Sequence, residues 1–320
     1  MTTSFRPFFP KGGVGFFHCK LCSVYSRAGI NIFIIQGVGP LFNKVAFIGA
    51  GSMAEAIITG VLAEDFLSAE QISVTNKENQ ERLTYLKNNY HVQVSCNKKQ
   101  VIQDASIVVL SMKPQDIKTA IEEIKPYLQQ EQIIVSILAG VSTNYISEHL
   151  EINMPVIRVM PNTSAMIGFS ATAIAGGKYA TETDVEKVKQ LFDTIGTTTT
   201  VEENDLHAVT GLSGSGPAYI YYMVEAMEAA AEETGLKKEV AKELIIQTLA
   251  GAAEMLKTTN EHPAVLRQKI TSPGGTTQAG IEALEKYKYQ EAMIACIKRA
   301  TARSIELGSS YQEGIEQKNK

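Results

Sequence analysis

The sequence predicts an α/β domain over residues 44–204, followed by an all-α domain over residues 205–320. From Lys44 onward, short apolar runs rich in β-branched residues alternate with helical segments, the pattern of a parallel sheet covered by helices. Beyond about Asn204 the strand signal stops and apolar residues recur at helical spacing. At 320 residues the chain is long enough to bury a core in each of two domains.

The first strand and the turn after it indicate what kind of α/β domain this is. Val45–Ile48 is followed by Gly49, Gly51 and Ala54 in the spacing G-x-G-x-x-A, and then by a helix. The first N–H groups of such a helix are unpaired and, with the helix dipole, can hold a pyrophosphate. Gly49 allows the tight turn, Gly51 lets a phosphate reach the backbone, and Ala54 lets the helix lie close to the strand. We predict a Rossmann-type dinucleotide-binding domain; the alternative is a glycine-rich turn without a ligand.

The end of the second strand, Ile72–Thr75, bears on the choice of dinucleotide. An acid at this position would bind the 2′-hydroxyl of NAD and repel the 2′-phosphate of NADP. Here the strand ends in Asn76 and Lys77, with Arg82 one turn into the next helix. This basic edge favours NADP(H), with NAD(H) also accepted; the alternative is that Lys77 and Arg82 form a solvated face.

Later strands place small or polar residues at the same edge of the sheet. The strands expected at Ile107–Leu110, Ile133–Leu138 and Val156–Met160 run into Ser111–Pro114, Ala139–Gly140 and Pro161–Thr163. Ligands of open α/β folds bind at the carboxyl ends of parallel strands, so these segments should line one crevice. A further strand is expected at Ala171–Ala175, and an amphipathic helix at Asp184–Ile195 with Gly196 as its C-cap.

The all-α domain contains many small apolar residues. Helices are expected at Leu206–Leu212, Ala218–Thr234, Val240–Leu256, Thr276–Tyr287 and Glu291–Leu307. Small residues let helices pack closely, and the wide apolar face exceeds what a small domain needs for its own core. We therefore expect an oligomer interface that also completes the active site.

Two stretches of the all-α domain are rich in glycine and hydroxyl groups. In Thr210–Tyr219, Ser215 can cap the helix that contains Pro217 in its first turn. Ser213 and Ser215 could face a ligand; close helix packing at Gly214 and Gly216 is an equal alternative.

The second of these stretches is Ser272–Thr277, with the sequence Ser-Pro-Gly-Gly-Thr-Thr. Its two glycines free the backbone immediately before a helix, which predicts a nest of N–H groups supplemented by hydroxyls. Such a nest suits a carboxylate, and the alternative is a plain capping turn.

Composition excludes several functions. The net charge of −4 gives no electrostatic reason to expect nucleic acid or an anionic membrane as a partner. Four cysteines do not form a disulfide framework, so a reducing, cytoplasmic location is expected. Cys19 and Cys22 form one C-x-x-C without a second pair, so no metal site is expected.

Residues 1–43 differ from the rest of the chain, because they contain no Asp or Glu. We expect a disordered tail or upstream sequence; a transit-like leader is the alternative.

Five motifs resemble those of the pyrroline-5-carboxylate reductases. They are Phe47–Ala54, Met112–Pro114, Arg158–Thr163, Ala208–Tyr219 and Ser272–Thr277, and their order and spacing agree from residue 44 to about residue 310. The resemblance implies NAD(P)H-dependent reduction of an imine, 1-pyrroline-5-carboxylate, to L-proline, the last step of proline synthesis. It also implies a homodimer whose helical domains interlock, often assembled further into a decamer.

The resemblance also implies roles for individual residues. Those expected to bind the cofactor are Gly49, Gly51, Ser52 and Met53 at the pyrophosphate, Asn76 and Lys77 at the adenosine, Met112, Lys113 and Pro114 at the nicotinamide ribose, and Ala139 and Asn162 at the nicotinamide. Those expected to bind the substrate carboxylate are Ser272, Gly275, Thr276 and Thr277, with Thr277 also near the ring nitrogen as the candidate catalytic residue. The chain departs from some relatives at Asn260, where they carry an acid; Glu261 is adjacent.

Two other classes of protein compete with this interpretation. One is a β-hydroxyacid dehydrogenase of similar two-domain plan, whose reaction needs a base. That chemistry resembles a family that places a Lys on the helix after its Gly-rich segment. This chain has no Lys there until Lys237. A nucleotide-binding sensor without activity has no need of the anion nest. His207, on an expected helix, is interpreted as structural rather than as a proton donor.

Overall fold

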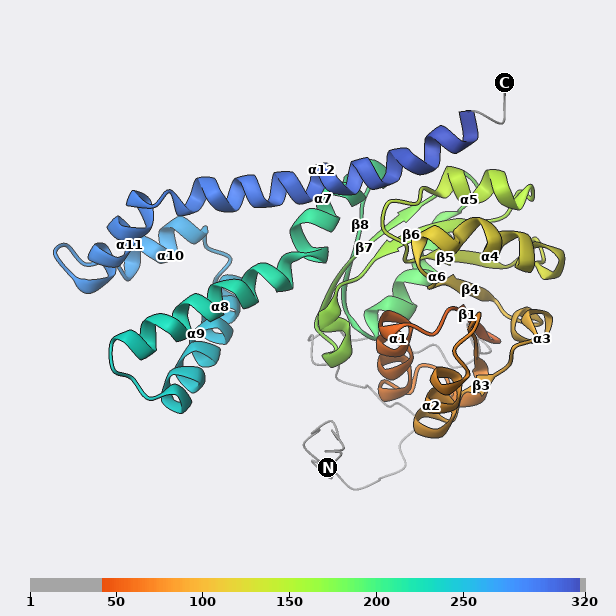
Figure 1. The fold of residues 1–320 in the computed structure, drawn as a ribbon, viewed down its shortest axis with the longest axis horizontal. Coiled ribbons are helices and arrows are strands. Elements are labelled where there is room, and N and C mark those ends of the chain that lie inside the picture. Colours follow the sequence, from red (N-terminus) through yellow and green to blue (C-terminus); the bar gives the residue numbers. More distant parts are fainter. Residues whose placement is uncertain (1–41, 317–320) are drawn as a thin grey trace, which may run out of the picture. The chain divides into compact units, whose positions relative to one another are not determined.

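The computed structural model describes residues 42–316, which contain one mixed sheet of eight strands (Figure 1). Its order is β3-β2-β1-β4-β5-β6-β7-β8. The strands are β1 Val45–Ile48, β2 Ile72–Thr75, β3 Gln93–Val94, β4 Ile107–Leu110, β5 Ile133–Ser136, β6 Val156–Met160, β7 Ser170–Gly176 and β8 Gly196–Thr200. The first six strands are parallel, β7 runs antiparallel to β6, and β8 is parallel to β7.

The register aligns the carboxyl ends of the central strands. Ile48 pairs with Thr75 of β2 and with Leu110 of β4, and Leu110 in turn pairs with Ser136 of β5. The loops that follow these four strands therefore leave the sheet at one edge, as the sequence predicts.

Helices cover both faces of the sheet and explain why its central strands are continuously apolar. One face packs on α1 Ser52–Ala63, α2 Gln80–Tyr90 and α6 Glu182–Asp193. The other face packs on α3 Lys98–Ile102, α4 Ile117–Ile124 and α5 Thr143–Leu150. All four residues of β1, β2, β4 and β5 are buried.

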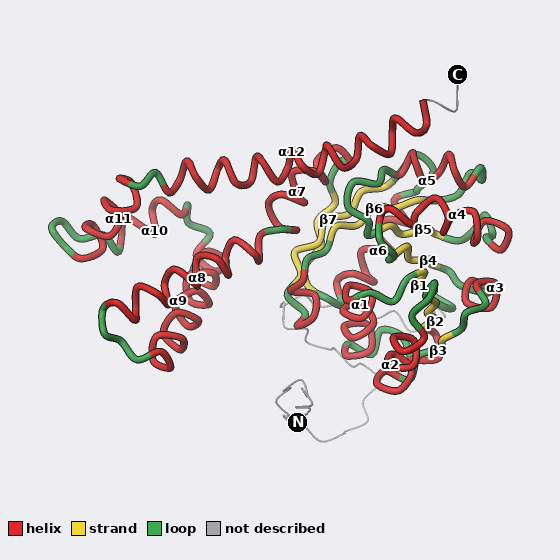
Figure 2. The backbone as a smooth tube through the Cα atoms, viewed as in Figure 1, coloured by secondary structure: helices red, strands yellow, loops and turns green. Residues whose placement is uncertain are grey.

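Helices alone follow the sheet in the described part of the chain (Figure 2). They are α7 Leu206–Val209, α8 Gly216–Glu233, α9 Lys238–Thr259, α10 Pro263–Lys269, α11 Thr276–Lys286 and α12 Tyr289–Glu316. A π-helical turn, η6 Thr210–Gly214, joins α7 to α8. The predicted fold class, a Rossmann-type domain followed by a helical one, is confirmed. Among residues 42–316, no helix combines the length and the apolar character needed to cross a bilayer.

Several predicted boundaries were wrong. Gly196 does not cap α6, which ends at Asp193 with Thr194 as its C-cap; it opens β8 with φ +152°, where an added Cβ would lie 2.8 Å from the Ser170 carbonyl carbon. Strands β3 and β8 and helix α10 were not predicted, because β3 is only two residues long and β8 is a threonine run without an apolar face. Strand β5 ends at Ser136, before the expected Leu138.

The described residues begin at Phe42, just before the predicted start of the α/β domain. Phe42, which the sequence analysis assigns to the N-terminal extension, is buried, and its ring centroid lies 5.5 Å from that of Phe66. The Asn43 N–H donates to Ser106 Oγ at 3.0 Å. Cys19 and Cys22 lie outside the described residues.

Candidate active site

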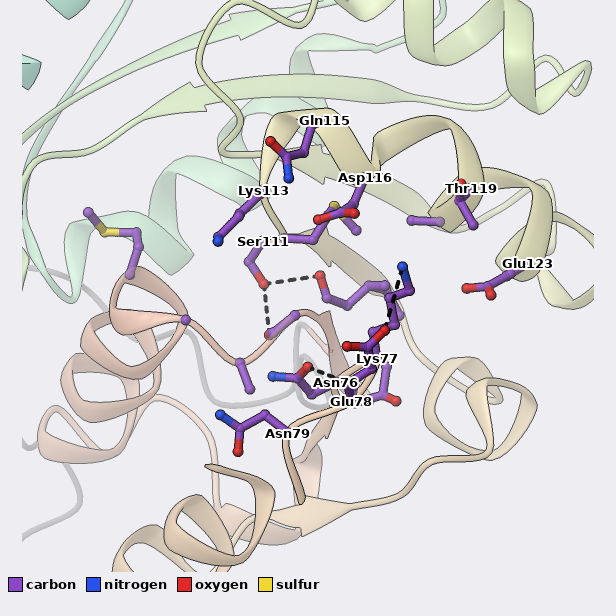
Figure 3. Close-up of a pocket in the computed structure, with 18 of the residues that line it drawn as sticks. Asn76, Lys77, Glu78, Asn79, Ser111, Lys113, Gln115, Asp116, Thr119 and Glu123 are labelled. Atoms are coloured by element: carbon purple, nitrogen blue, oxygen red, sulfur yellow. Dashed lines mark hydrogen bonds and ion pairs between the residues drawn. The ribbon is translucent and has the colours of Figure 1, made fainter. Parts of the chain in front are cut away.

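A cavity of about 610 Å³ opens at the carboxyl edge of the sheet (Figure 3). This volume lies in the range of small-molecule and cofactor sites. Its walls are the turn after β1, the loop after β2, the loop after β4 with α4, and Ile137 after β5. The predicted cofactor residues that line it are Gly49, Gly51, Ser52, Met53, Asn76, Lys77, Met112 and Lys113.

The turn between β1 and α1 is held between its two neighbouring strands. Gly49 has φ +118°, and an added Cβ would lie 2.5 Å from the Ser111 carbonyl carbon, so only glycine fits. The Gly49 N–H donates to the Thr75 carbonyl at 3.0 Å, and the Ser111 hydroxyl donates to the Gly49 carbonyl at 2.9 Å. The last residue of β2 and the first residue after β4 thus fix the turn from both sides.

The N-terminus of α1 is free to bind an anion. Gly51 is its N-cap, and no side chain accepts a hydrogen bond from the first N–H groups. An added Cβ at Gly51 would meet only the Ser111 carbonyl oxygen, at 3.8 Å, so the protein leaves space beside the turn. Ala54 is fully buried and lets α1 lie against the sheet. Unpaired N–H groups at a helix start, facing a cavity, are an anion site.

The loop after β2 forms the other end of the cavity. In Figure 3, Asn76, Lys77, Glu78 and Asn79 lie along this loop. Lys77 is exposed, and its Nζ lies 3.8 Å from Glu78 Oε1. The Asn79 side chain caps α2 by accepting the Arg82 N–H at 2.8 Å. Lys77 thus stands in the cavity lining with 58% of its side chain exposed.

Arg82, the other cation of the predicted basic edge, makes contacts within the protein. Its Nε–H donates to the Ala50 carbonyl at 2.7 Å, and its Nη2 pairs with the carboxylate of Glu55 on α1. Two of its three guanidinium nitrogens therefore have partners within the protein.

Three predicted cofactor residues lie outside the cavity lining. Pro114 begins a 3₁₀ turn, and Ala139 packs on a small apolar cluster that includes Met160 and Leu206. The buried Asn162 amide donates to the Ser213 carbonyl at 3.1 Å, and its Oδ1 accepts the Ser164 N–H at 3.1 Å. Asn162 thus ties the end of β6 to the π-helical turn, and its contact with a nicotinamide remains a prediction.

Ser272–Thr277, the predicted nest, turns directly into α11 and lies outside the cavity lining. Gly274 has φ +70°, Gly275 is the N-cap of α11, and no side chain caps that helix. The Gly274 N–H is taken by Gln278 Oε1 at 2.8 Å, and the Gly275 N–H by the Ser272 carbonyl at 3.0 Å. The N–H groups of α11 itself remain for a ligand. No residue of the nest lines the cavity, so one chain does not bring the two predicted sites together.

The segment before α10 gives no free carboxylate. Asn260 ends α9 in the left-handed region at φ +56°, a conformation that asparagine tolerates well. Both Glu261 oxygens accept from Lys269 Nζ, at 2.6 and 2.8 Å, and His262 Nδ1 caps α10. The adjacent acid, Glu261, is therefore paired with Lys269 in this segment.

In the Thr210–Tyr219 stretch, the glycine that allows close helix packing is Gly211 rather than the expected Gly214 or Gly216. Nothing lies within 4 Å of a Cβ added at Gly216, and Gly214 has only ordinary contacts. At Gly211, an added Cβ would lie 2.9 Å from the Ile297 carbonyl of α12. Ser215 precedes α8, but its side chain accepts no capping bond.

Sequence reasoning missed a buried ionic cluster beneath the site. Arg158 on β6 is buried, and its Nη1 lies 3.6 Å from Glu203 Oε1. His207 bonds Ser304 of α12 through Nδ1 at 2.9 Å, a structural role that agrees with its interpretation. Burial lowers the pKa of His207, and the charge of Arg158 lowers it further, with Glu203 opposing. An arginine inside an apolar strand was the available signal, because such a cation needs a carboxylate.

A parallel-sheet domain whose first helix opens uncapped onto a cavity, followed by a helical domain, defines a Rossmann-type NAD(P)-dependent oxidoreductase. Residues 44–140 match the profile of the family "NADP oxidoreductase coenzyme F420-dependent". Residues 203–307 match that of "Pyrroline-5-carboxylate reductase dimerisation".

Individual relatives agree with these profiles. The chain is 46% identical to pyrroline-5-carboxylate reductase 1 of Bacillus subtilis, over 86% of this chain and 93% of that protein. It is 40% identical to the Arabidopsis thaliana pyrroline-5-carboxylate reductase, over 83% of this chain and 96% of that protein. The structure of the Coxiella burnetii reductase superposes with a TM-score of 0.77 at 34% identity, covering 83% of this chain and 98% of that one. The structure of the Plasmodium falciparum pyrroline carboxylate reductase with NADP bound superposes with a TM-score of 0.76 at 27% identity, covering 83% of this chain and 98% of that one. The chain belongs to the pyrroline-5-carboxylate reductase family.

Proposed function

We propose that the chain reduces 1-pyrroline-5-carboxylate to L-proline with NAD(P)H, as the last step of proline biosynthesis. The observation that carries the proposal is the uncapped start of α1, open to the cavity, in a chain 46% identical to a named reductase. The alternative chemistry of a hydroxyacid dehydrogenase is not supported, because α8 begins Gly-Pro-Ala-Tyr and supplies no lysine base.

The dinucleotide fits the residues present. The α1 N-terminus would hold the pyrophosphate, Lys77 the 2′-phosphate of NADP(H), and Met112 and Lys113 the nicotinamide ribose. When bound, the reduced cofactor supplies a hydride for the imine carbon. Lys77 supports a preference for NADP(H), with NAD(H) also accepted, since no acid occupies its place.

The substrate residues act by positioning. The N–H groups at the start of α11, with Thr276 and Ser272, would hold the carboxylate. The Thr277 hydroxyl would hold the ring nitrogen in place, and Gly275 is the N-cap of the helix that presents it. A protonated imine is already electrophilic, so the protein's main task is to bring two rings into contact.

A second copy of the chain is part of this proposal. Large apolar side chains of α8 and α9 are exposed, with Tyr222 at 77%, Leu244 at 55% and Ile246 at 56%. Because the nest lines no part of the cavity in its own chain, a homodimer that brings the nest of one protomer to the cavity of the other is supported. A decamer is the larger assembly proposed. Light scattering should give at least twice the mass of one chain.

The proposal includes a cytoplasmic location and no nucleic-acid or membrane partner. Cys96 and Cys296 are free thiols among the described residues, and the net charge is −4.

The test of the activity is a spectrophotometric assay. The purified protein should oxidise NADPH, followed by its absorbance, only when 1-pyrroline-5-carboxylate is added, and proline should accumulate. Turnover of a β-hydroxyacid, with none of the imine, would refute the proposal in favour of the dehydrogenase. Binding of NADPH without any turnover would favour a sensor.

A further inference from the structure

Helix α2 reaches back to the glycine-rich turn through one side chain. Arg82, in the first turn of α2, donates from Nε to the Ala50 carbonyl at 2.7 Å. Ala50 stands between Gly49 and Gly51, in the middle of the turn that would hold the pyrophosphate. The carbonyl of Ala50 and the N–H of Gly51 belong to one planar trans peptide and point in opposite directions. A bond that fixes the carbonyl therefore fixes the direction of the Gly51 N–H.

The same guanidinium neutralises an acid on α1. Arg82 Nη2 pairs with Glu55 Oε2, and the Tyr90 hydroxyl donates to Glu55 Oε1 at 2.7 Å. Burial opposes ionisation of Glu55, but hydrogen bonds from Tyr90 and Arg82 outweigh it and lower the pKa of the carboxyl. Tyr85, 5.1 Å beneath the guanidinium carbon, holds Arg82 from its other side.

The position of Glu55 makes this neutralisation matter. It is the fourth residue of α1, and its side chain is only 11% exposed. An unpaired carboxylate this close to the helix start would repel a pyrophosphate bound there, and weak solvent screening would leave much of that repulsion intact.

We propose that Glu55, Arg82 and Tyr90 form a clamp that presets the dinucleotide turn, with Arg82 as a positioning residue rather than a ligand of the 2′-phosphate. Arg82 aligns the Ala50–Gly51 peptide and cancels the Glu55 charge. The inference rests on the proposed dinucleotide site and identifies what prepares it. Because the clamp acts at the pyrophosphate, which NADPH and NADH share, it contributes equally to the binding of both.

The test compares the dissociation constants of NADPH and NADH, measured by calorimetry on the full chain. Arg82→Met should weaken both by about tenfold and leave their ratio unchanged. The double variant Glu55→Gln/Arg82→Met should recover at least half of that loss on a logarithmic scale, because the repelling charge is gone. If Arg82→Met acted only by disrupting the turn, adding Glu55→Gln would not restore the affinity.

Two control variants frame the result. Lys77→Asp, at the proposed 2′-phosphate end, should change the ratio. Arg299→Met removes an exposed arginine that is likewise paired to a glutamate, Glu306, and should change neither constant. If Arg82→Met does not fold, Arg82→Lys replaces it, because the single ammonium of lysine does not reproduce the two contacts that Arg82 makes through separate nitrogens.

The outcomes separate the inference from the proposed function. A loss confined to NADPH would make Arg82 a phosphate ligand and overturn the clamp. Unchanged affinities, or a double variant as weak as Arg82→Met, would also overturn it. A wild-type protein that binds neither dinucleotide would refute the proposed function, and the clamp with it.

Discussion

The guanidinium of Arg158 and the carboxylate of Glu203 lie 3.6 Å apart and join the sheet to the start of the helical segment. Arg158 stands in β6 and is 1% exposed, whereas Glu203 begins the turn before α7. Glu203 also accepts the Thr143 N–H of α5 at 2.7 Å. The Glu203 carboxylate thus connects strand β6, helix α5 and the turn that leads into α7.

Removing this carboxylate should destabilise the protein. Glu203→Gln leaves a buried cation without its countercharge, and we expect a loss of about 3 kcal/mol in the free energy of unfolding. Urea denaturation followed by circular dichroism measures it. Replacing both partners, Arg158→Met with Glu203→Met, should cost less than Glu203→Gln alone, because no buried charge remains. A double variant that loses more than the single one would contradict this account.

Stability should fall on acidification, partly through His207. Its pKa is lowered below the ordinary 6.5 by burial and by Arg158, so at mildly acidic pH the unfolded chain binds a proton that the folded chain refuses. This contribution is complete above 6.5 and is lost as the pH falls from there toward the folded-state value. His207→Asn should therefore show a smaller drop in unfolding free energy between pH 7.5 and 5.5. The same drop in both proteins would exclude His207 as a source.

The two glycines of the turn should respond differently to alanine. Gly49→Ala places a Cβ 2.5 Å from a backbone carbon at φ +118°, so the fold should lose stability. Gly51→Ala has φ −73° and meets no protein atom closer than 3.8 Å, so its melting temperature should stay near wild type while NADPH affinity falls about tenfold or more. Calorimetry and thermal melts on both variants distinguish the two effects. Unchanged NADPH binding in Gly51→Ala would place the pyrophosphate elsewhere.

Lys77 should set the cofactor preference. Lys77→Asp places an acid where the 2′-phosphate is expected, and the NADPH/NADH ratio of kcat/KM should fall about tenfold, or ~1.4 kcal/mol. Lys87→Asp makes the same charge change in the last turn of α2 and should leave the ratio unaltered. Equal behaviour of the two variants would move the phosphate pocket away from Lys77.

Thr277 should act on the substrate and not on the cofactor. Thr277→Ala removes a hydroxyl from the nest, and kcat/KM for 1-pyrroline-5-carboxylate should fall about tenfold or more with the NADPH dissociation constant unchanged. Thr271→Ala is the matched control, since its hydroxyl bonds back to the Arg267 carbonyl at 2.7 Å. Weakened NADPH binding in Thr277→Ala would contradict the assignment.

Local pattern was enough to predict the central sheet. Strands such as Val45–Ile48 and Ile107–Leu110 are buried on both faces, so an apolar run marks each one. Strand β8 was missed because an edge strand of threonines, largely solvent-exposed, carries no such mark. The spacing of Gly49, Gly51 and Ala54 also predicted the turn between β1 and α1, because the residues that define this turn lie within six consecutive positions.

Partners distant in sequence were beyond that reasoning. A cation after a strand can serve a ligand or a neighbour, and only the fold places Arg82 against Glu55, 27 positions earlier. Likewise, Ser272–Thr277 reads as an anion site from local sequence, but its absence from the cavity of its own chain is a property of tertiary structure.

Helix α12 touches both α11, which carries the nest, and α5, which covers the sheet. Near its far end Gly308 lies against Gly140 after β5, where an added Cβ would meet the Gly140 carbonyl oxygen at 3.0 Å. At about 1.5 Å per residue, the helix from Tyr289 to Gly308 is a rigid arm of roughly 28 Å. A tilt of about 5° at this pivot would swing the other end by roughly 2.5 Å, more than the ~1 Å misplacement that can cost a reaction two orders of magnitude. The missing side chains of Gly140 and Gly308 therefore allow the close approach that fixes the direction of α12 and, through it, the position of α11.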